Sequence, residues 1–143
     1  MAGALTMTMD ERQAFLADVH VGVIAIAEDG RGPLAVPVWY DYEPGGDLTV
    51  LMQSDSRKAL GIDAAGRFSL CAQSETAPYQ YVTVEGPVTA TESYNKDDLQ
   101  AMATRYLGEE GGKAYVAGSD PSANSVKITM SPQRWLSVDY SKR

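Results

Sequence analysis

The chain has 143 residues, of which 44% are hydrophobic and 22% are charged, and its formal net charge is −7. This length suits one domain with its own core, so we expect a single domain over residues 1–143. The negative charge argues against general affinity for nucleic acid or for an acidic membrane, because both need a basic face.

The N-terminal third predicts a short helix and then two paired strands. Thr8 and Glu11 have the spacing of a capping box, and apolar residues at helical spacing follow them. The segment 21–27 is rich in β-branched residues and ends at a turn, after which 33–40 resumes an extended pattern. Pro37 has no N–H for a ladder hydrogen bond, so its strand is expected at a sheet edge or with a bulge.

A third strand, expected at 48–52, leads into the run Gln53-Ser54-Asp55-Ser56-Arg57-Lys58, which opens a short helix. Two cations beside the positive end of a helix are unfavourable unless an anion lies next to them. Free amide N–H groups, serine hydroxyls and two cations would together form a cradle for a phosphate. The alternative is a surface helix whose cations pair with Asp55, with Asp63 or with water.

Four more strands complete the predicted sheet, at 67–73, 79–90, 123–130 and 135–140. Cys71, the only cysteine, falls in an apolar run and is expected in the core. In the long strand, the Gly86-Pro87 pair indicates a bulge or a barrel corner. Short turns join most of these strands, a pattern more typical of an antiparallel barrel than of a doubly wound sheet.

One long amphipathic helix is expected between the long strand and the last two. Asn95 is its cap, apolar residues recur at helical spacing as far as Tyr106, and Gly108 ends it. The glycine-rich segment 108–112 carries two acids where a phosphate-binding loop needs bare backbone or a lysine, so it is interpreted as a turn. A short helical piece is expected to follow at 114–117.

Several kinds of chemistry lack their residues. His20 is the only histidine and no Gly-x-Ser-x-Gly motif occurs, which argues against a hydrolytic triad. One histidine and one cysteine give no zinc-ligand spacing, so no metal site is assigned; a carboxylate-only metal site is left open, without a sequence signature. The N-terminus lacks the pattern of a signal peptide and no apolar run could span a membrane, so we expect a cytoplasmic protein.

The cradle after the third strand, the extended segments 36–40 and 81–86, and the tail 132–140 together resemble a known family. The chain resembles the split β-barrel flavin and deazaflavin oxidoreductases related to pyridoxamine 5′-phosphate oxidase, over nearly its whole length. The segment 105–112 and the last strand resemble the actinobacterial branch that uses the deazaflavin coenzyme F420. The resemblance implies a mainly β fold with flanking helices, a split β-barrel of six or more mostly antiparallel strands.

The resemblance also implies a homodimer with two cofactors in the clefts between its barrels. The cofactor phosphate would be held by Arg57 and Lys58. Hydrogen bonds to it would come from Gln53, Ser54 and Ser56. The ring system would lie along Pro37, Val38 and Trp39. From the partner subunit, the cleft would be reached by Tyr79 and Tyr81.

The implied function is an F420-dependent reductase that transfers hydride to an activated double bond of a small organic molecule. An FMN-dependent oxidoreductase is the second hypothesis, because both cofactors carry a phosphate and a flat tricyclic ring. A non-catalytic cofactor- or ligand-binding protein and a purely structural dimer are the other two. Relatives often carry further basic residues after the Arg-Lys pair, whereas this chain continues with 59–63, so its phosphate affinity or its preference for an anionic tail is expected to differ.

Overall fold

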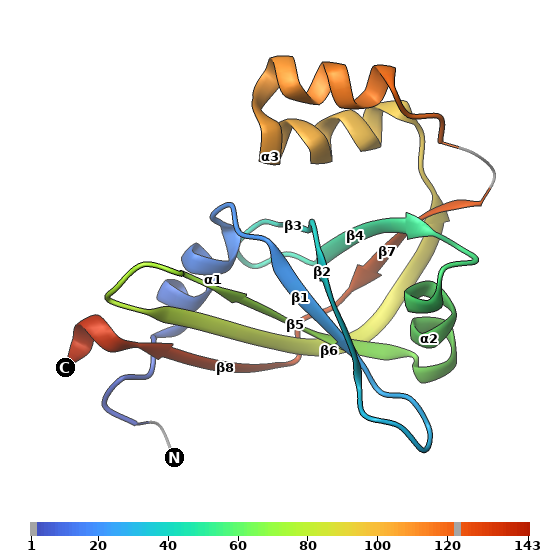
Figure 1. Ribbon diagram of the computed structural model, residues 1–143. Helices are drawn as coiled ribbons and strands as arrows, with labels where there is room; N and C mark the ends of the chain where they lie inside the picture. The colour runs from blue at the N-terminus through green and yellow to red at the C-terminus, as the bar shows by residue number, and fades with distance from the viewer. Residues whose placement is uncertain (1–2, 122–123) are drawn as a thin grey trace.

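The computed structural model describes residues 3–121 and 124–143, which form a curled antiparallel sheet flanked by helices (Figure 1). The elements in chain order are α1 (Met9–Ala17), β1 (Gly22–Ile26), β2 (Leu34–Val38), β3 (Asp41–Tyr42), β4 (Leu48–Gln53), α2 (Arg57–Ala65), β5 (Arg67–Gln73), β6 (Gln80–Ser93), α3 (Lys96–Ala117), β7 (Ser125–Met130), β8 (Arg134–Asp139) and the 3-10 turn η1 (Tyr140–Lys142). None of the helices in the described ranges is long and apolar enough to cross a membrane.

The sheet follows the order β2-β1-β5-β6-β7-β4-β3, with β8 paired to β6, and every pairing is antiparallel. The 14-residue strand β6 holds its two halves together, because its first part pairs with β5 and β8 and its last part with β7. The change of partner falls at Gly86, where a Cβ would overlap the carbonyl oxygen of Ser131. The barrel corner predicted at Gly86-Pro87 is therefore confirmed, with a register shift between Val88 and Ala90.

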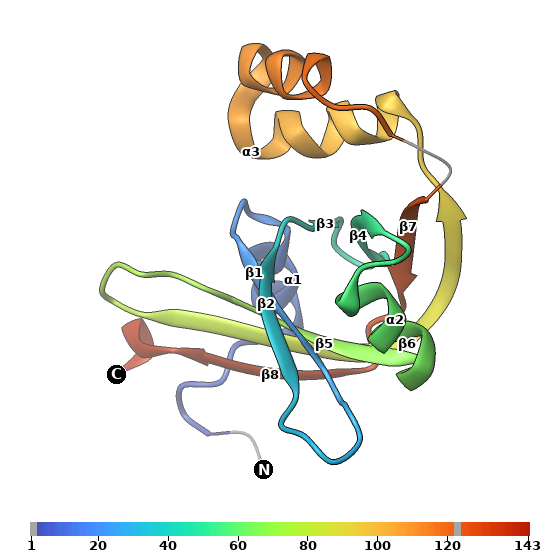
Figure 2. The same ribbon diagram turned by 45° about the vertical axis from the view of Figure 1, so that its right-hand side comes forward.

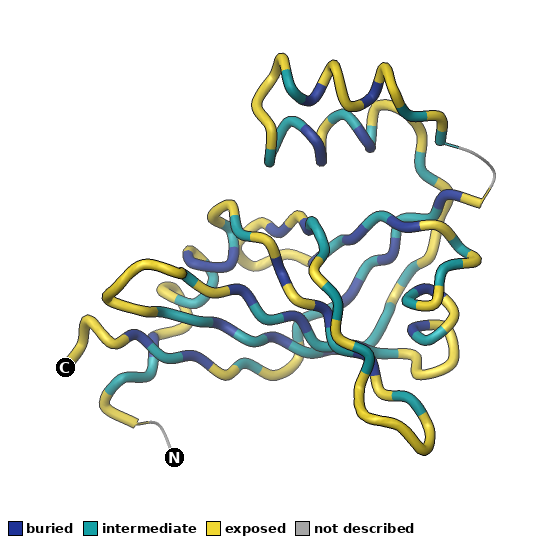
Figure 3. Tube along the Cα trace, viewed as in Figure 1, coloured by how far each residue is buried: buried dark blue, intermediate teal, exposed yellow. Residues whose placement is uncertain are grey.

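Alternating burial along the strands makes the core. Ile24, Leu70 and Val84 are fully buried on the inner face of the sheet, and Leu16 of α1 packs into the same cluster (Figure 3). Cys71 lies between two buried neighbours and therefore points to the outer face, where it is half-buried opposite Val23 and Thr83. The prediction of a core cysteine was wrong, because the period of a strand puts adjacent residues on opposite faces.

The predicted helix starts and ends are confirmed where they depend on local hydrogen bonds. Thr8 and Asn95 both cap their helices through a complete capping box. Gly66 ends α2 in the left-handed conformation, with φ of 73°, which glycine adopts without a Cβ clash. Pro37 lies in β2, which ends the sheet path, so its missing N–H falls on an edge strand as expected.

The second half of α3 differs from the prediction. Gly108, with φ of 78°, breaks the helix as expected, but residues 109–117 continue as a second helical segment that folds back beside the first (Figure 1). The turn predicted at 108–112 is thus mostly helix. A Cβ on Gly112 would lie 3.0 Å from the Cα of Thr104, so this glycine lets the two segments pack closely. The start predicted for the next strand, Ala123, lies outside the described residues.

Candidate cofactor site

The turn between β4 and α2 has the geometry of a helix start that can bind an anion. Ser56 is the cap: its Oγ accepts a hydrogen bond from the amide of Ala59 at 3.2 Å and donates one to the carbonyl of Gln53 at 2.7 Å. Within residues 3–121 and 124–143, the amide N–H groups of Arg57 and Lys58 have no hydrogen-bond partner. These two donors therefore remain available at the positive end of the helix dipole.

Arg57 does not project freely from this turn. Its Nη2 and Nε donate to the two carboxylate oxygens of Glu28 at 2.6 and 3.2 Å. Glu28 lies in the turn between β1 and β2, and its hydrogen bond to Arg57 holds the pKa of its carboxyl below the usual range. The partner of Arg57 is thus neither of the acids considered from the sequence, Asp55 and Asp63.

Lys58 is half-buried and has no carboxylate within 4.0 Å in the part of the chain that the structure describes. Beside the helix start lies an open groove of about 780 Å³. The charged residues that line it are Glu28, Asp29, Asp55, Arg57 and Arg67. Lys58 is therefore the cation of the predicted cradle whose charge is not compensated by an ion pair.

Gln53 and Ser54 are tied to β7 at the other side of the turn. The side-chain amide of Gln53 donates to Oγ of Ser125 at 3.3 Å, and the backbone amide of Ser54 donates to the carbonyl of Asn124 at 2.6 Å. Ser54 also lines a cavity of about 350 Å³ between α2 and the β6–β7 pair, whose other walls are mostly apolar. These two residues thus lie beside the helix start, and their hydrogen bonds to a phosphate stay a prediction.

The residues predicted to lie along a ring system sit at the other end of β1 and β2 from Glu28. Pro37 faces outward opposite Val23, and Val38 is half-buried against the core. Trp39 stacks on Tyr106 of α3, with ring centroids 4.9 Å apart and planes 7° apart, and packs at a tilt on Tyr115. A ligand that touched both Arg57 and Trp39 would have to extend along β2.

Tyr79 and Tyr81 lie far from this helix start within one chain. Tyr79 is 54% exposed at the end of the β5–β6 hairpin, which Figures 1 and 2 show projecting away from α2. Tyr81 pairs with Gln73, and β5 separates Gln73 from Arg67 by its full length of seven residues, roughly 20 Å. The structure does not bring these tyrosines to the cradle, so a contact with the same ligand requires a second copy of the chain.

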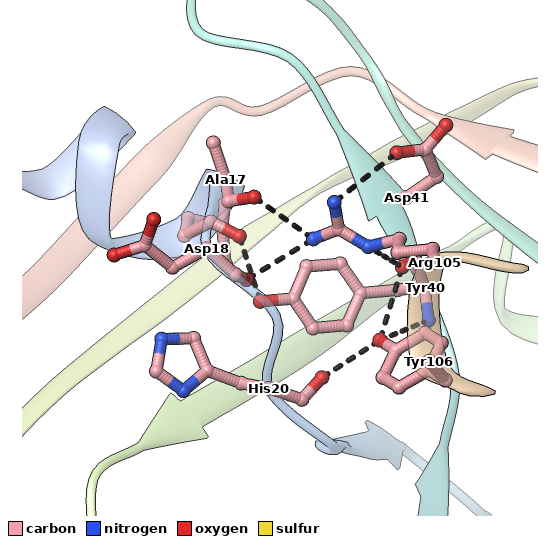
Figure 4. Close-up of polar contacts among 8 residues, drawn as sticks. Ala17, Asp18, His20, Tyr40, Asp41, Arg105 and Tyr106 are labelled. Atoms are coloured by element: carbon pink, nitrogen blue, oxygen red, sulfur yellow. Dashed lines mark hydrogen bonds and ion pairs between the residues drawn. The ribbon is translucent and has the colours of Figure 1, made fainter. Parts of the chain in front are cut away.

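A polar cluster that the sequence analysis missed anchors α3 to the barrel (Figure 4). The guanidinium of Arg105 donates to the carbonyl oxygens of Ala17, Asp18 and Tyr40 at 3.0 to 3.1 Å, and lies 3.7 Å from the carboxylate of Asp41. Only 16% of its side chain is exposed. In the sequence, the only indication of this cluster is that Arg105 lies next to the apolar residues of the helix. That position does not reveal which backbone carbonyls the arginine contacts.

Tyr106 completes this anchor. Its hydroxyl accepts a hydrogen bond from the amide of Tyr40 at 2.9 Å and donates to the carbonyl of His20 at 2.7 Å (Figure 4). Burial raises the pKa of the Tyr106 hydroxyl, which therefore stays protonated as a donor. The ring of His20 stacks on Phe15 with centroids 4.3 Å apart, and its Nε2 is buried without a partner in the described ranges.

The curled antiparallel sheet, with a long shared strand and flanking helices, is a split β-barrel of the pyridoxamine 5′-phosphate oxidase type, as the resemblance implied. The fold matches an F420 reductase with a TM-score of 0.71 and 19% identity, over 87% of this chain and 94% of that one. It also matches a putative pyridoxamine 5′-phosphate oxidase from Listeria innocua, with a TM-score of 0.66 and 16% identity, over 90% and 96% of the two chains.

A third structure, an FAD-binding protein from Mesorhizobium loti, matches with a TM-score of 0.64 and 21% identity, over 92% of this chain and 94% of that one. No protein-family model matches the sequence, and no curated protein sequence matches it. At these identities, the likeness to the solved structures establishes the fold.

Proposed function

We propose that this protein is an oxidoreductase that binds coenzyme F420 and transfers hydride to an activated double bond of a small organic molecule. The observation that carries the proposal is the start of α2, where, among the described residues, two amides have no hydrogen-bond partner and Lys58 has no ion pair, an arrangement that fits a phosphate. The F420 reductase among the structures of the same fold supports this choice of cofactor. An FMN-dependent oxidoreductase is the second candidate, and the FAD-binding protein of the same fold supports a flavin cofactor in general.

In this proposal the cofactor supplies the hydride chemistry and the chain positions it. Lys58 and the first-turn amides of α2 hold the phosphate. Arg57 contributes less to this binding, because the carboxylate of Glu28 partly neutralises its charge. The side chains of Gln53, Ser54 and Ser56 add polar contacts around it. The ring system lies along β2, near Pro37, Val38 and Trp39, where the aromatic stack with α3 limits the reach of the cleft.

The proposed assembly is a homodimer with the cofactor at the subunit interface. One row across the outer face of the sheet joins Pro37, Val23, Cys71, Thr83 and Leu136 through their strand pairings. Val23 and Leu136 are 41% and 59% exposed there, and contiguous apolar surface of this kind is typical of an interface. A second copy on this face would bring its Tyr79 and Tyr81 toward the cleft.

The test is a titration of the purified protein with F420 and, separately, with FMN, followed by quenching of cofactor fluorescence. We expect tight binding of F420 and a loss of about tenfold or more in affinity in the Arg57→Ala/Lys58→Ala variant, because charged hydrogen bonds contribute strongly. The melting temperature of the apo-protein should change little, since Arg57 is 53% exposed. Lys58→Ala alone should weaken binding more than Arg57→Ala alone.

Lys113→Ala is the matched control, because this exposed lysine lies on α3 and pairs only with Glu109 in the described part of the chain. Unchanged affinity for F420 in the double variant would contradict the proposed phosphate cradle. Preference for FMN would favour the second candidate. Binding of neither cofactor would contradict both, and would leave a structural role or another ligand.

A further inference from the structure

A small pocket lies between α3 and the end of β4, next to the predicted phosphate cradle. Its volume is about 140 Å³. The residues that line it are Gln53, Tyr94, Leu99, Tyr115, Ser119, Asp120 and Pro121. Sites for drug-sized ligands have volumes of roughly 300–1,000 Å³, so this smaller pocket suits a molecule of a single ring.

The helix beside this pocket has apolar packing of its own. The side chains of Leu99, Met102, Ala103 and Val116 on α3 are buried, but none of them belongs to the core cluster of the barrel. Figures 1 and 2 show α3 as a layer apart from the sheet, continuing from the end of β6. The pocket therefore lies where helix and barrel meet, and both contribute to its walls.

Tyr115 and Gln53 connect the pocket with the proposed cofactor site. The ring of Tyr115 packs on Trp39, with centroids 5.3 Å apart and planes 47° apart. Trp39 is one of the residues along which the cofactor ring is proposed to lie, and Gln53 is one of the proposed phosphate contacts. The pocket thus borders the proposed cofactor site at its ring end and at its phosphate end.

Two tyrosine hydroxyls of the lining are available as hydrogen-bond donors. In the part of the chain that the structure describes, the tyrosine hydroxyls that make hydrogen bonds are those of Tyr40, Tyr42 and Tyr106. Tyr94 is half-buried and Tyr115 is 44% exposed, and neither hydroxyl has such a partner. A phenolic O–H can donate to a carbonyl oxygen that enters the pocket.

The charge of the lining favours a neutral ligand. Among the described residues, the lining has one carboxylate, Asp120, and neither lysine nor arginine. A negatively charged ligand is therefore disfavoured. Leu99 and the two tyrosine rings offer apolar surface to the rest of the molecule. The complementary ligand is small, neutral and mostly apolar, with one acceptor oxygen.

We propose that this pocket binds the hydride acceptor, a small cyclic α,β-unsaturated ketone, and that Tyr94 and Tyr115 donate hydrogen bonds to its carbonyl oxygen. This inference rests on the proposed function, in which the reduced cofactor supplies the hydride. Addition of hydride to the β-carbon forms a C–H bond, breaks the C=C π bond and moves its electron pair toward the carbonyl oxygen. Donors at this oxygen stabilise the developing negative charge. A proton from water at the α-carbon then restores the carbonyl group.

The experiment measures binding of 2-cyclohexen-1-one to the cofactor-free protein by ligand-observed NMR, with cyclohexene as the probe that lacks the carbonyl. We expect Tyr115→Phe and Tyr94→Phe each to raise the dissociation constant of 2-cyclohexen-1-one by about threefold to tenfold, because each removes one hydrogen bond. The affinities for cyclohexene and for F420 should not change. With reduced F420 present, kcat/KM should fall by more than the affinity, since the oxygen carries most charge in the transition state.

Tyr140→Phe is the matched control, because its hydroxyl makes no hydrogen bond in the described ranges and it lies in η1, at the end of the chain. No binding of 2-cyclohexen-1-one to wild type, or equal binding to wild type and both variants, would overturn the site. A parallel loss of F420 affinity would also overturn it, since the hydroxyls would then hold the cofactor. These results leave the proposed function intact. If F420 does not bind to wild type, the proposed function fails, whereas tyrosine-dependent binding of 2-cyclohexen-1-one would still support the pocket.

Discussion

Burial and stacking set the charge of His20. Desolvation, aided by the nearby Arg105, lowers the pKa of its imidazole, although backbone hydrogen bonds with Phe15 and Gln73 and the charge of Asp18 act in the opposite direction. Nε2 has no hydrogen-bond partner among the described residues. His20 is thus stabilised as the neutral ring, and its carbonyl oxygen receives the Tyr106 hydroxyl that anchors α3.

This burial predicts a pH dependence of stability. A group whose pKa is lowered in the folded state binds protons more readily when unfolded, so its contribution is complete above the unfolded pKa, about 6.5, and declines as the pH falls below it. We expect wild type to lose free energy of unfolding between pH 7.5 and pH 5.5, roughly the window of His20. In the His20→Gln variant, the free energy of unfolding, measured by urea titration at the two pH values, should change less between them.

The carboxylates with lowered pKa values do not change the stability between about pH 7.5 and pH 5.5. Glu11, Glu28 and Asp139 also have lowered pKa values, which their hydrogen bonds to Lys142, Arg57 and Ser141 cause. Their contributions are present above the unfolded pKa of a carboxyl, about 4, and are lost only as the pH falls through their lower folded values. Parallel pH profiles for wild type and His20→Gln would therefore show that His20 does not control stability above that range.

The helix α3 is held by polar side chains as well as by apolar packing. Arg105 and Tyr106 form hydrogen bonds with backbone atoms of Ala17, His20 and Tyr40, as Figure 4 shows. These atoms lie at the end of α1, just before β1 and just after β2. Trp39 stacks on Tyr106 of the first helical segment and packs at a tilt on Tyr115 of the second. Since Trp39 also borders the proposed ring site, we expect the docking of α3 to affect the shape of that site.

This anchor predicts the effect of Tyr106→Phe. The substitution keeps the stack on Trp39 but leaves the amide of Tyr40 and the carbonyl of His20 without the hydroxyl, which costs about 1–3 kcal/mol for part-buried groups. Hydrogen exchange should quicken in α3 before it changes in β5 and β6. Tyr115→Phe is the control, because the Tyr115 hydroxyl makes no hydrogen bond in the described ranges and its ring also packs on Trp39. Equal effects of the two variants would contradict the anchoring role.

For the whole molecule, the exposed face of the sheet is the feature that one chain leaves unexplained. The apolar row through Val23 and Leu136 lies opposite the core, and Val21 beside it is 54% exposed. A charge placed in the middle of such a face is costly to bury against a second copy. The assembly proposed above can therefore be tested without any cofactor.

We expect wild type to have the mass of a dimer in light scattering after size-exclusion chromatography, and Leu136→Glu to shift it toward the monomer. Leu107→Glu is the control, since Leu107 is also exposed, at 47%, but lies on α3 away from that face. A monomeric wild type, or equal behaviour of the two variants, would remove the homodimer. It would also remove the proposed role of Tyr79 and Tyr81, which depends on a partner.

The sequence by itself determined the features that depend on neighbours within a few residues. The caps at Thr8, Ser56 and Asn95, the left-handed glycine at 66 and the strand order along the chain all follow from local hydrogen bonds, steric freedom and period. The same is true of the two cations in the first turn of α2. The misplaced turn at 108–112 shows the limit, because Gly112 is required by packing against Thr104 and not by a change of chain direction.

Only the tertiary structure decided which charges meet. Glu28 and Arg57 are 29 residues apart, and Arg105 reaches the carbonyl of Tyr40 across 65 residues. Such pairs depend on strand register and on the direction in which a helix returns to the sheet. Neither of these can be inferred from the sequence of a short segment. The sequence could therefore predict that α2 starts with two cations. The net charge at this helix start also depends on Glu28, which lies in a turn that folding brings beside it.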